Sequence, residues 1–168
     1  MEFKTIYKKD FKENRLLYLE LIKELYDGDN DKIANISETT NYLDFIFSDN
    51  YDFDSFLILQ IENNKIIAMI SGYEYDTYHS EWCLCALFIR KEYRGEGLGK
   101  KIVEKAFEEM KKYNYSKIII GIEEDNIISR KLFLNKGFIY ANKNWDELAE
   151  GFPKNHLGYY YENNTIKK

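Results

Sequence analysis

The chain has 168 residues, about the length of one domain when a domain takes roughly 100 to 200 residues. Hydrophobic residues make up 45% and charged residues 32%, with a single proline, a balance that builds a buried core and excludes extensive disorder or collagen-like repeats. The 24 basic and 29 acidic residues leave a net charge of -5, which repels nucleic-acid phosphates and anionic lipid, so we expect no nucleic-acid or membrane partner.

The N-terminal part of the chain has the leucine spacing of an amphipathic helix. Three leucines recur every four residues, Leu17, Leu21 and Leu25, and with Tyr18 and Ile22 beside them they form one helical stripe. Asp10 with Glu13 predicts a capping box at the start of this helix, and Gly28 predicts its end. A second helix is expected over about 31–48.

A hairpin and a buried strand are predicted next. Segments 55–62 and 65–75 are rich in Ile, Leu and Phe and flank Asn63-Asn64, a pair that tolerates the positive φ of a tight turn. Gly72 in the second segment is expected to mark a bulge. Segment 82–89 is apolar at every position, which is typical of a central strand covered on both faces.

Helices and strands alternate in the second half of the chain. Apolar residues at helical spacing predict a helix over 98–110. Buried runs and cap residues predict the remaining elements: a strand at 117–122, a helix at 126–136 closed by Gly137, and strands at 138–141 and 157–161. The order of elements predicts an α/β fold with a mixed sheet, in a single domain over 1–168.

Cysteine and histidine are too few to suggest a metal site. Cys83 and Cys85 lie two apart on a predicted strand, so they share a face, do not readily bridge each other, and are expected to be buried free thiols. The only histidines, His79 and His156, are not at zinc-like spacing from another donor, so we expect no metal. The N-terminal residues lack the apolar stretch of a secretory signal, which predicts a cytoplasmic protein.

A glycine cluster joins the predicted strand 82–89 to the predicted helix 98–110. Glycines at 95, 97 and 99 allow a ligand to approach the backbone closely, and the first N–H groups of a helix attract anions. The segment therefore predicts a phosphate cradle, with a ligand-free strand-to-helix turn as the alternative. Neither the G-x-G-x-x-G spacing of dinucleotide sites nor the P-loop spacing fits these glycines.

Two motifs together resemble a known family. The segment Arg94-Gly95-Glu96-Gly97-Leu98-Gly99 resembles the [RQ]-x-x-G-x-[GA] loop of the GNAT N-acetyltransferase superfamily. The segment 126–138 resembles that family's N-x-x-[AS]-x-x-L-Y-x-x-x-G-F helix and strand. With the upstream helices and hairpin, the resemblance covers nearly the whole chain. It implies the GNAT acyltransferase fold, a twisted mixed sheet flanked by helices and splayed beside strand 82–89, and transfer of an acetyl group from acetyl-CoA to an amine.

The resemblance also implies where acetyl-CoA binds. In that family, backbone groups of the strand before the loop bind the pantetheine arm, which here are those of Leu87, Phe88 and Ile89. The loop that binds the pyrophosphate corresponds to Arg94, Gly95, Glu96, Gly97, Leu98, Gly99 and Lys100. Asn126 matches an asparagine near the pantetheine, whereas from its spacing alone it is a helix N-cap.

The sequence departs from the family at the expected proton donor. Many members carry a tyrosine that protonates the departing thiolate. Phe133 stands at that position in this chain, so the resemblance implies that it contacts the coenzyme, but it has no proton to donate. Ribosomal-protein N-terminal acetyltransferases carry a glutamate where this chain has Gly121, which counts against that subfamily. Glu123 lies on the same strand face as Gly121 and is the leading candidate for the general base, followed by Glu81 and His79.

The acceptor is suggested by acidic residues interleaved with aromatic ones. Asp49, Asp52 and Asp54 alternate with Tyr51 and Phe53, and tyrosines and acids recur over 73–78. Such a pattern suits a cationic small molecule such as a polyamine or aminoglycoside, through ion pairs and cation–π contacts, with a merely solvated loop as the alternative.

Other functions remain open at this point. A peptide or protein amine is the alternative acceptor, and a non-catalytic acyl-CoA-binding sensor is favoured by the residues at positions 121 and 133. Acetylation of charged tRNA would need a basic face, which the net charge disfavours. The family resemblance also allows a homodimer.

Overall fold

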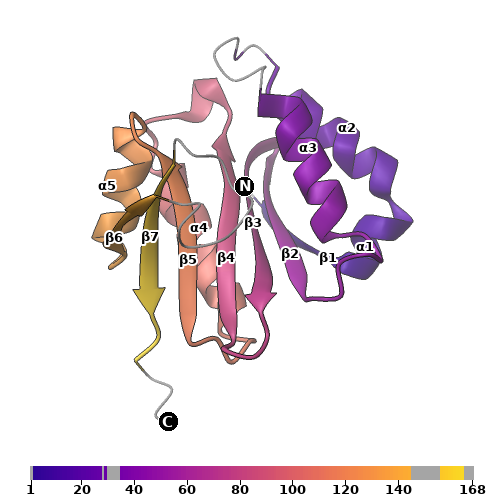
Figure 1. Cartoon of the computed structure of the whole chain (residues 1–168). Helices are drawn as coiled ribbons and strands as arrows, with labels where there is room; N and C mark the ends of the chain where they lie inside the picture. The colour runs from indigo at the N-terminus through magenta and orange to yellow at the C-terminus, as the bar shows by residue number, and fades with distance from the viewer. Residues whose placement is uncertain (1, 28, 30–34, 145–155, 165–168) are drawn as a thin grey trace. The chain divides into compact units, whose positions relative to one another are not determined.

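Seven strands of the computed structural model form one hydrogen-bonded sheet within the described residues, which are 2–27, 29, 35–144 and 156–164. They lie in the order β1-β2-β3-β4-β5-β7-β6 (Figure 1). Their bounds, in chain order, are β1 Glu2–Tyr7, β2 Ser55–Glu62, β3 Lys65–Asp76, β4 Glu81–Ile89, β5 Lys117–Glu123, β6 Ile139–Asn144 and β7 His156–Glu162. β4 and β5 run parallel, whereas β1–β2, β2–β3, β5–β7 and β6–β7 are antiparallel, so the predicted mixed α/β sheet is confirmed.

The chain forms two compact units, and β3 and β4 each contribute residues to both. We call them the N-terminal unit, Met1–Tyr73 with Ala86–Glu109, and the C-terminal unit, Glu74–Cys85 with Met110–Lys168. The described residues contain no helix that is both long and apolar enough to cross a membrane.

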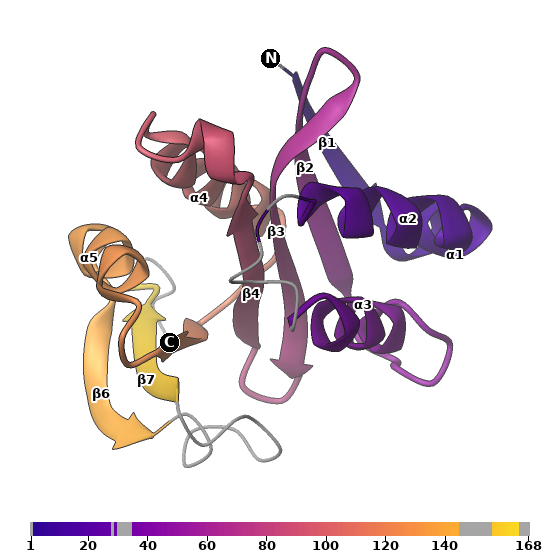
Figure 2. The ribbon, with the colours of Figure 1, turned by 90° about the horizontal axis from the view of Figure 1, so that it is seen from above.

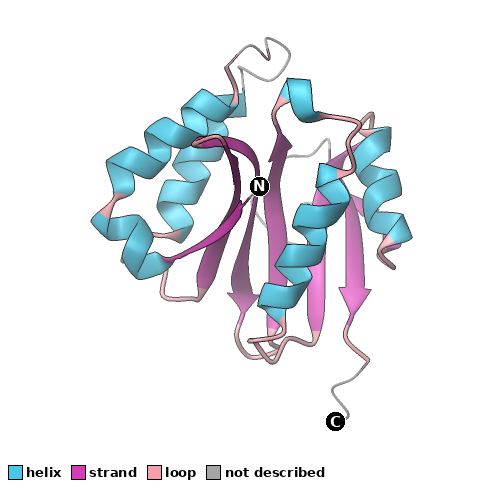
Figure 3. Ribbon diagram, turned by 180° about the vertical axis from the view of Figure 1, so that it is seen from behind, coloured by secondary structure: helices cyan, strands magenta, loops and turns pink. Residues whose placement is uncertain are grey.

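Helices cover both faces of the sheet in the N-terminal unit (Figures 1 and 2). Three of them precede β2 in the chain: α1 Lys8–Glu13, α2 Arg15–Leu25 and α3 Asn35–Ile46. α2 and α3 lie on one face, and α4, Leu98–Met110, lies on the other, as the view from behind shows (Figure 3). Buried side chains fill the space between helices and strands, among them Ile22, Leu43, Phe56, Ile70, Ile102 and Ala106.

The N-terminal strand and the helix start differ from the sequence-based expectations. β1 has no predicted counterpart, although its burial alternates as in a half-buried strand, and it pairs antiparallel with β2. The predicted single helix is divided at Asn14 into α1 and α2. The predicted capping box is wrong, because Asp10 lies inside α1 and neither N-cap residue makes a side-chain cap hydrogen bond.

The buried face of α2 contains three of the five residues of the predicted stripe. Tyr18, Ile22 and Leu25 are buried, whereas Leu17 is 53% exposed. The second predicted helix is α3, which runs unbroken to Ile46, and the predicted start at 31–34 lies outside the described residues.

The predicted hairpin is confirmed, with a correction to its bulge. Asn63 and Asn64 have φ angles of 49° and 61°, which close β2 and β3 with a tight turn. The register shift lies between Gln60 and Ile61, whereas Gly72 pairs regularly with Phe56. Gly72 therefore marks no bulge.

α2 and α3 are joined by an ion pair that makes stability sensitive to acid. Arg15 donates to both carboxylate oxygens of Asp44, with 2.6 Å between Nη2 and Oδ2, and this hydrogen bonding lowers the pKa of Asp44. A lowered pKa in the folded state adds stability above the ordinary value near pH 4, and that stability is lost as the pH falls through the lowered pKa.

We therefore expect Asp44→Asn to lower the free energy of unfolding at pH 7 by less than about 1 kcal/mol, because the pair is partly exposed. The difference from the wild type should disappear near pH 2, which urea unfolding at pH 7, 4 and 2 would measure. Asp52→Asn is the control, since Asp52 is exposed and has no ion pair with a described residue. A difference that persists at pH 2 would contradict the prediction.

In the C-terminal unit, β5 pairs with β7 and β7 with β6, and helix α5, Ile127–Asn135, lies beside β6 and β7 (Figures 1 and 2). The Asn126 side chain accepts a 3.1 Å hydrogen bond from the backbone N–H of Ser129, so the predicted N-cap is confirmed. Gly137 follows the end of the helix and has a φ of +100°. A Cβ added to Gly137 would lie 3.5 Å from the Tyr161 ring. Only glycine takes this backbone conformation readily.

Candidate functional site

The predicted phosphate cradle lies entirely in the N-terminal unit. After β4, a 3₁₀ turn at Lys91–Tyr93 leads into the glycine loop and then into α4. Gly95 and Gly97 have φ angles of +85° and +77°, values that side-chain-bearing residues adopt only with strain. The loop therefore needs glycine at these positions for its path.

The start of α4 presents backbone donors beside this loop. The N–H of Lys101 donates to the carbonyl of Gly97 at 3.3 Å, which begins the helical hydrogen-bond pattern. The N–H groups of Leu98, Gly99 and Lys100 precede it, where a helix leaves donors for an anion. A Cβ added at Gly97 would meet nothing within 4 Å, so the space in front of the loop is open. Backbone donors at a helix start suit an anion.

Arg94 is bound within the protein, at a partner that sequence reasoning missed. Its Nη2 donates to the carboxylate of Asp29, and its Nε donates to the carbonyl of Ile89 at 3.0 Å. Its guanidinium also lies over the Phe88 ring, 5.4 Å from the centroid. No local sequence signal marks Asp29, because it stands in a polar run, Asp27-Gly28-Asp29-Asn30, that is typical of any loop.

The predicted pantetheine strand is the last part of β4, and the 3₁₀ turn joins it to the loop. Phe88 is buried, whereas Leu87 and Ile89 are half-buried. Ala86, just before them, has a φ of +52° inside β4, a left-handed conformation that is typical of a β-bulge and rare for a non-glycine residue. Sequence reasoning missed Ala86, since alanine in an apolar run carries no signal for positive φ.

Asn126, Phe133 and Glu123 lie in the C-terminal unit. Glu123 is half-buried at the end of β5, and its carbonyl accepts the N–H of Asn126 at 3.0 Å. Phe133 is 4% exposed and contacts the Phe138 ring edge-on, with 5.2 Å between centroids. Arg130 holds the start of α5 in place through the carbonyl of Glu124, at 2.9 Å.

The second-choice bases are engaged by neighbours in the same unit. Glu81 accepts a hydrogen bond from the Tyr75 hydroxyl and pairs with Lys117, with 2.5 Å between Nζ and Oε1. Burial, followed by the hydrogen bond to Glu81, raises the pKa of Tyr75. His79 lies exposed in the turn before β4, with its Nδ1 2.7 Å from a carboxylate oxygen of Asp76. That contact lowers the pKa of Asp76.

The predicted coenzyme residues 87–89 and 94–100 thus lie in the N-terminal unit. The predicted catalytic residues lie in the C-terminal unit, as do Asn126 and Phe133. Within the described part of the chain, no group of three or more His, Cys, Asp or Glu side chains is arranged to hold a metal ion.

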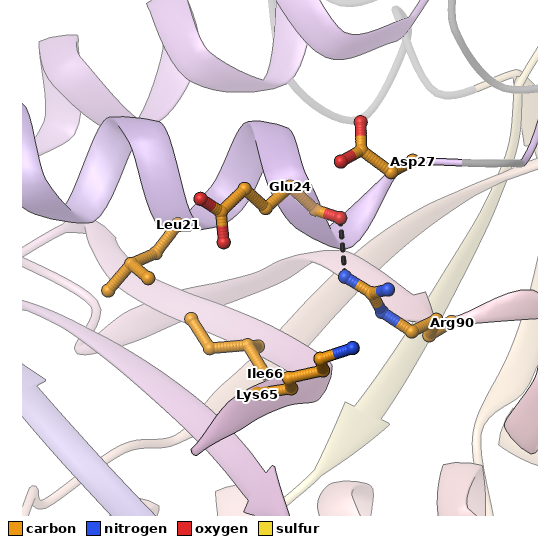
Figure 4. Close-up of a pocket in the computed structure, with 6 residues that line it drawn as sticks. All are labelled: Leu21, Glu24, Asp27, Lys65, Ile66 and Arg90. Atoms are coloured by element: carbon orange, nitrogen blue, oxygen red, sulfur yellow. Dashed lines mark hydrogen bonds between the residues drawn. The ribbon is translucent and has the colours of Figure 1, made fainter. Parts of the chain in front are cut away.

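A pocket of about 200 Å³ lies beside Arg90 and contains none of these predicted residues (Figure 4). Its lining residues are Leu21, Glu24, Asp27, Lys65, Ile66 and Arg90. Arg90 donates from Nη2 to the carbonyl of Glu24, near the end of α2, where a cation is favoured by the helix dipole. The pocket therefore lies where the end of α2, the start of β3 and the residue after β4 meet, and no glycine-loop residue lines it.

Comparison with known proteins agrees with this architecture. A protein-family model described as the acetyltransferase (GNAT) family matches residues 19–138. No curated protein sequence matches the chain.

Three solved structures illustrate the similarity of fold. The ribosomal-protein-alanine N-acetyltransferase from Brucella melitensis is 14% identical, with a TM-score of 0.60 over 97% of this chain and 100% of that one. An aminoglycoside 6'-acetyltransferase of type Ii is 11% identical, with a TM-score of 0.69 over 100% and 99%. A GNAT family acetyltransferase from Elizabethkingia anophelis, solved with acetyl-CoA bound, is 16% identical, with a TM-score of 0.56 over 73% and 82%.

Proposed function

Because this chain belongs to the GNAT acetyltransferase family, we propose that its acceptor is the primary amine of a cationic small molecule, similar to an aminoglycoside or a polyamine. The chain is an acetyl-CoA-dependent N-acetyltransferase, and acetyl-CoA supplies the activated acetyl group. The open glycine loop and the first N–H groups of α4 would hold the pyrophosphate.

The observation that carries the acceptor proposal is the acidic, aromatic segment 49–54. Asp52 and Asp54 are exposed and make no ion pair with a described residue. Asp49 is different, because Lys12 binds its carboxylate and lowers its pKa. Two of the three aspartates therefore have charge available for an ammonium group.

Aromatic rings stand among these carboxylates. Tyr51 contacts Phe53 and Tyr73 edge-on, with 5.1 and 5.8 Å between ring centroids. The Lys8 ammonium already lies 5.9 Å from the Tyr51 centroid, so a cation is compatible with this ring. The cluster supports recognition of a cationic acceptor by charge and by ring faces together.

For the chemistry, we assign the general base to Glu123, with Glu81 and His79 as alternatives. The acceptor ammonium must lose a proton before its nitrogen attacks the acetyl carbonyl, and a carboxylate can take it directly or through one water. Glu123 supports this role because it lies half-buried at the end of β5, on the same strand face as Gly121. Phe133 has no proton for the leaving thiolate, so that proton comes from another group or from water.

A peptide amine is the second candidate acceptor, and the similarity to the Brucella ribosomal-protein-alanine N-acetyltransferase favours it. This chain has Gly121 at the position where that subfamily carries a glutamate, which weighs against a peptide acceptor.

We also propose that residues 1–168 form a single domain, since β3 and β4 each run from one unit into the other. Cytoplasmic location and a homodimer are further proposals.

The acceptor proposal is tested by following release of the coenzyme A thiol with aminoglycosides, polyamines, amino acids and short peptides. A cationic small molecule should give the highest kcat/KM. Replacing both Asp52 and Asp54 with asparagine should raise its KM about fivefold to tenfold, because two attractive charges are lost.

Asp49→Asn is the matched control and should change the KM less, since Lys12 already neutralises that carboxylate. The KM for acetyl-CoA should stay constant in all these variants. Faster acetylation of an uncharged or peptide amine, together with an unchanged KM in the Asp52 and Asp54 double variant, would refute the cationic acceptor.

A further inference from the structure

We infer that Asp29 is a positioning residue for acetyl-CoA binding, which acts by holding Arg94 beside the glycine loop. The inference rests on the use of acetyl-CoA by this chain and is independent of which amine is the acceptor. Asp29 lies outside the motif that identifies the loop, 65 residues before Arg94 in the chain.

Asp29 is buried in a way that requires a cationic partner. It is 1% exposed, its Oδ2 accepts a hydrogen bond from Arg94, and its backbone N–H donates to the carbonyl of Tyr26 at 3.1 Å. Its Oδ1 is also buried and has no hydrogen-bond partner among the described residues. A buried carboxylate is stable only when it is paired, and Arg94 supplies the pairing charge.

Arg94 in turn is restrained on three sides. The carbonyl of Ile89 accepts from its Nε, Asp29 accepts from its Nη2, and the Phe88 ring lies beneath its guanidinium. Phe88 is itself fixed against Tyr26, with 4.0 Å between ring centroids. Since a free arginine side chain samples many rotamers, these contacts select one before any ligand binds.

The restrained guanidinium still has donors to offer. Arginine has five N–H donors, and the contacts to Ile89 and Asp29 use two of them. The Arg94 side chain remains 42% exposed, directly before Gly95 at the start of the loop. A diphosphate held by the backbone N–H groups of the loop would therefore meet a cation that is already oriented.

A second arginine fixes the segment that carries Asp29. Arg90 donates from its backbone N–H to the carbonyl of Ile67 at 2.8 Å, and its Nη2 donates to the carbonyl of Glu24 (Figure 4). These bonds tie the end of α2 to the end of β4, and Asp29 lies five residues after Glu24 in the same unit. The backbone N–H of Asp29 is bonded to Tyr26, close to this tied helix end.

The test measures the Kd of coenzyme A by titration calorimetry, with KM and kcat measured separately. Asp29→Asn keeps the size of the side chain and removes its charge, and it should raise the Kd about fivefold to tenfold, with kcat within about twofold. Arg94→Lys keeps the positive charge and loses the fork geometry, so it should raise the Kd to a similar extent. Asp27→Asn, an exposed aspartate in the same turn, is the matched control and should leave the Kd unchanged.

A double variant separates this role from a purely structural one. If Asp29 acts through Arg94, Asp29→Asn should add nothing to the loss of affinity caused by Arg94→Gln. The same double variant should melt at a higher temperature than Arg94→Gln alone, because the unpaired buried carboxylate is gone.

An unchanged Kd in Asp29→Asn with only a lower melting temperature would overturn the inference. Tighter binding would overturn it as well, since Asp29 would then compete with the phosphates for Arg94. No acceptor takes part in this titration, so failure of the acceptor proposal leaves its result intact.

Discussion

Replacing Glu123 with glutamine should lower kcat for the best amine acceptor by about 100-fold or more, the scale of a lost general base. Glutamine keeps the shape of the side chain and cannot take a proton from the acceptor ammonium. Glu123 is half-buried at the end of β5, and its backbone carbonyl positions the N–H of Asn126 at 3.0 Å. The Kd of acetyl-CoA should change less than about twofold, because proton removal belongs to the chemical step.

The pH dependence distinguishes a base from a merely structural carboxylate. At a pH high enough to deprotonate the acceptor amine in solution, the variant should regain part of the lost rate, since the enzyme no longer has to remove that proton. Initial rates of thiol release across pH 6 to 10 would show this recovery. A structural defect would depress the rate by the same factor at every pH.

Glu81→Gln is the matched control, because Glu81 is also a half-buried glutamate in the C-terminal unit. Its carboxylate is already engaged by Lys117 and Tyr75, so we expect a loss below about fivefold in kcat. The reverse outcome, a large loss in Glu81→Gln and a small one in Glu123→Gln, would move the general base to Glu81.

Local features of the sequence predicted most of the fold. The turn at Asn63-Asn64, the cap at Asn126 and the end at Gly137 depend on each residue's own backbone preferences, and all three are confirmed. β1 depends on pairing with β2, and the buried face of α2 depends on how the helix packs against the sheet. Sequence periodicity does not settle these long-range choices, so β1 has no predicted counterpart, and the exposed Leu17 is not distinguished from the buried Tyr18, Ile22 and Leu25 of the same stripe.

In the candidate site, too, local features were predictable from the sequence and long-range features were not. The glycine loop is a local device, which is why its residues and its helix start were predictable from spacing. The partner of Arg94 is 65 residues away, and Ala86 has a positive φ inside β4. Neither has a sequence signal, because acidic loop residues and alanines are common in positions without such roles.

Gly97→Ala should weaken acetyl-CoA binding by at least about tenfold, because it disturbs the backbone that holds the pyrophosphate. Gly97 has φ +77°, and an added Cβ would project into the open space in front of the loop. Alanine at this φ would strain the backbone and displace the first N–H groups of α4, which follow Gly97 directly. The left-handed backbone also costs about 1 kcal/mol of stability once a side chain is present.

Gly137→Ala provides the control that separates these two effects. Gly137 has φ +100°, so alanine there suffers similar backbone strain, and its Cβ would lie 3.5 Å from the Tyr161 ring in the C-terminal unit. Both variants should lose stability in thermal unfolding, but only Gly97→Ala should raise the Kd of coenzyme A. Equal Kd values in the two variants would mean that the glycine loop is a strand-to-helix turn without a ligand, and that the pyrophosphate binds elsewhere.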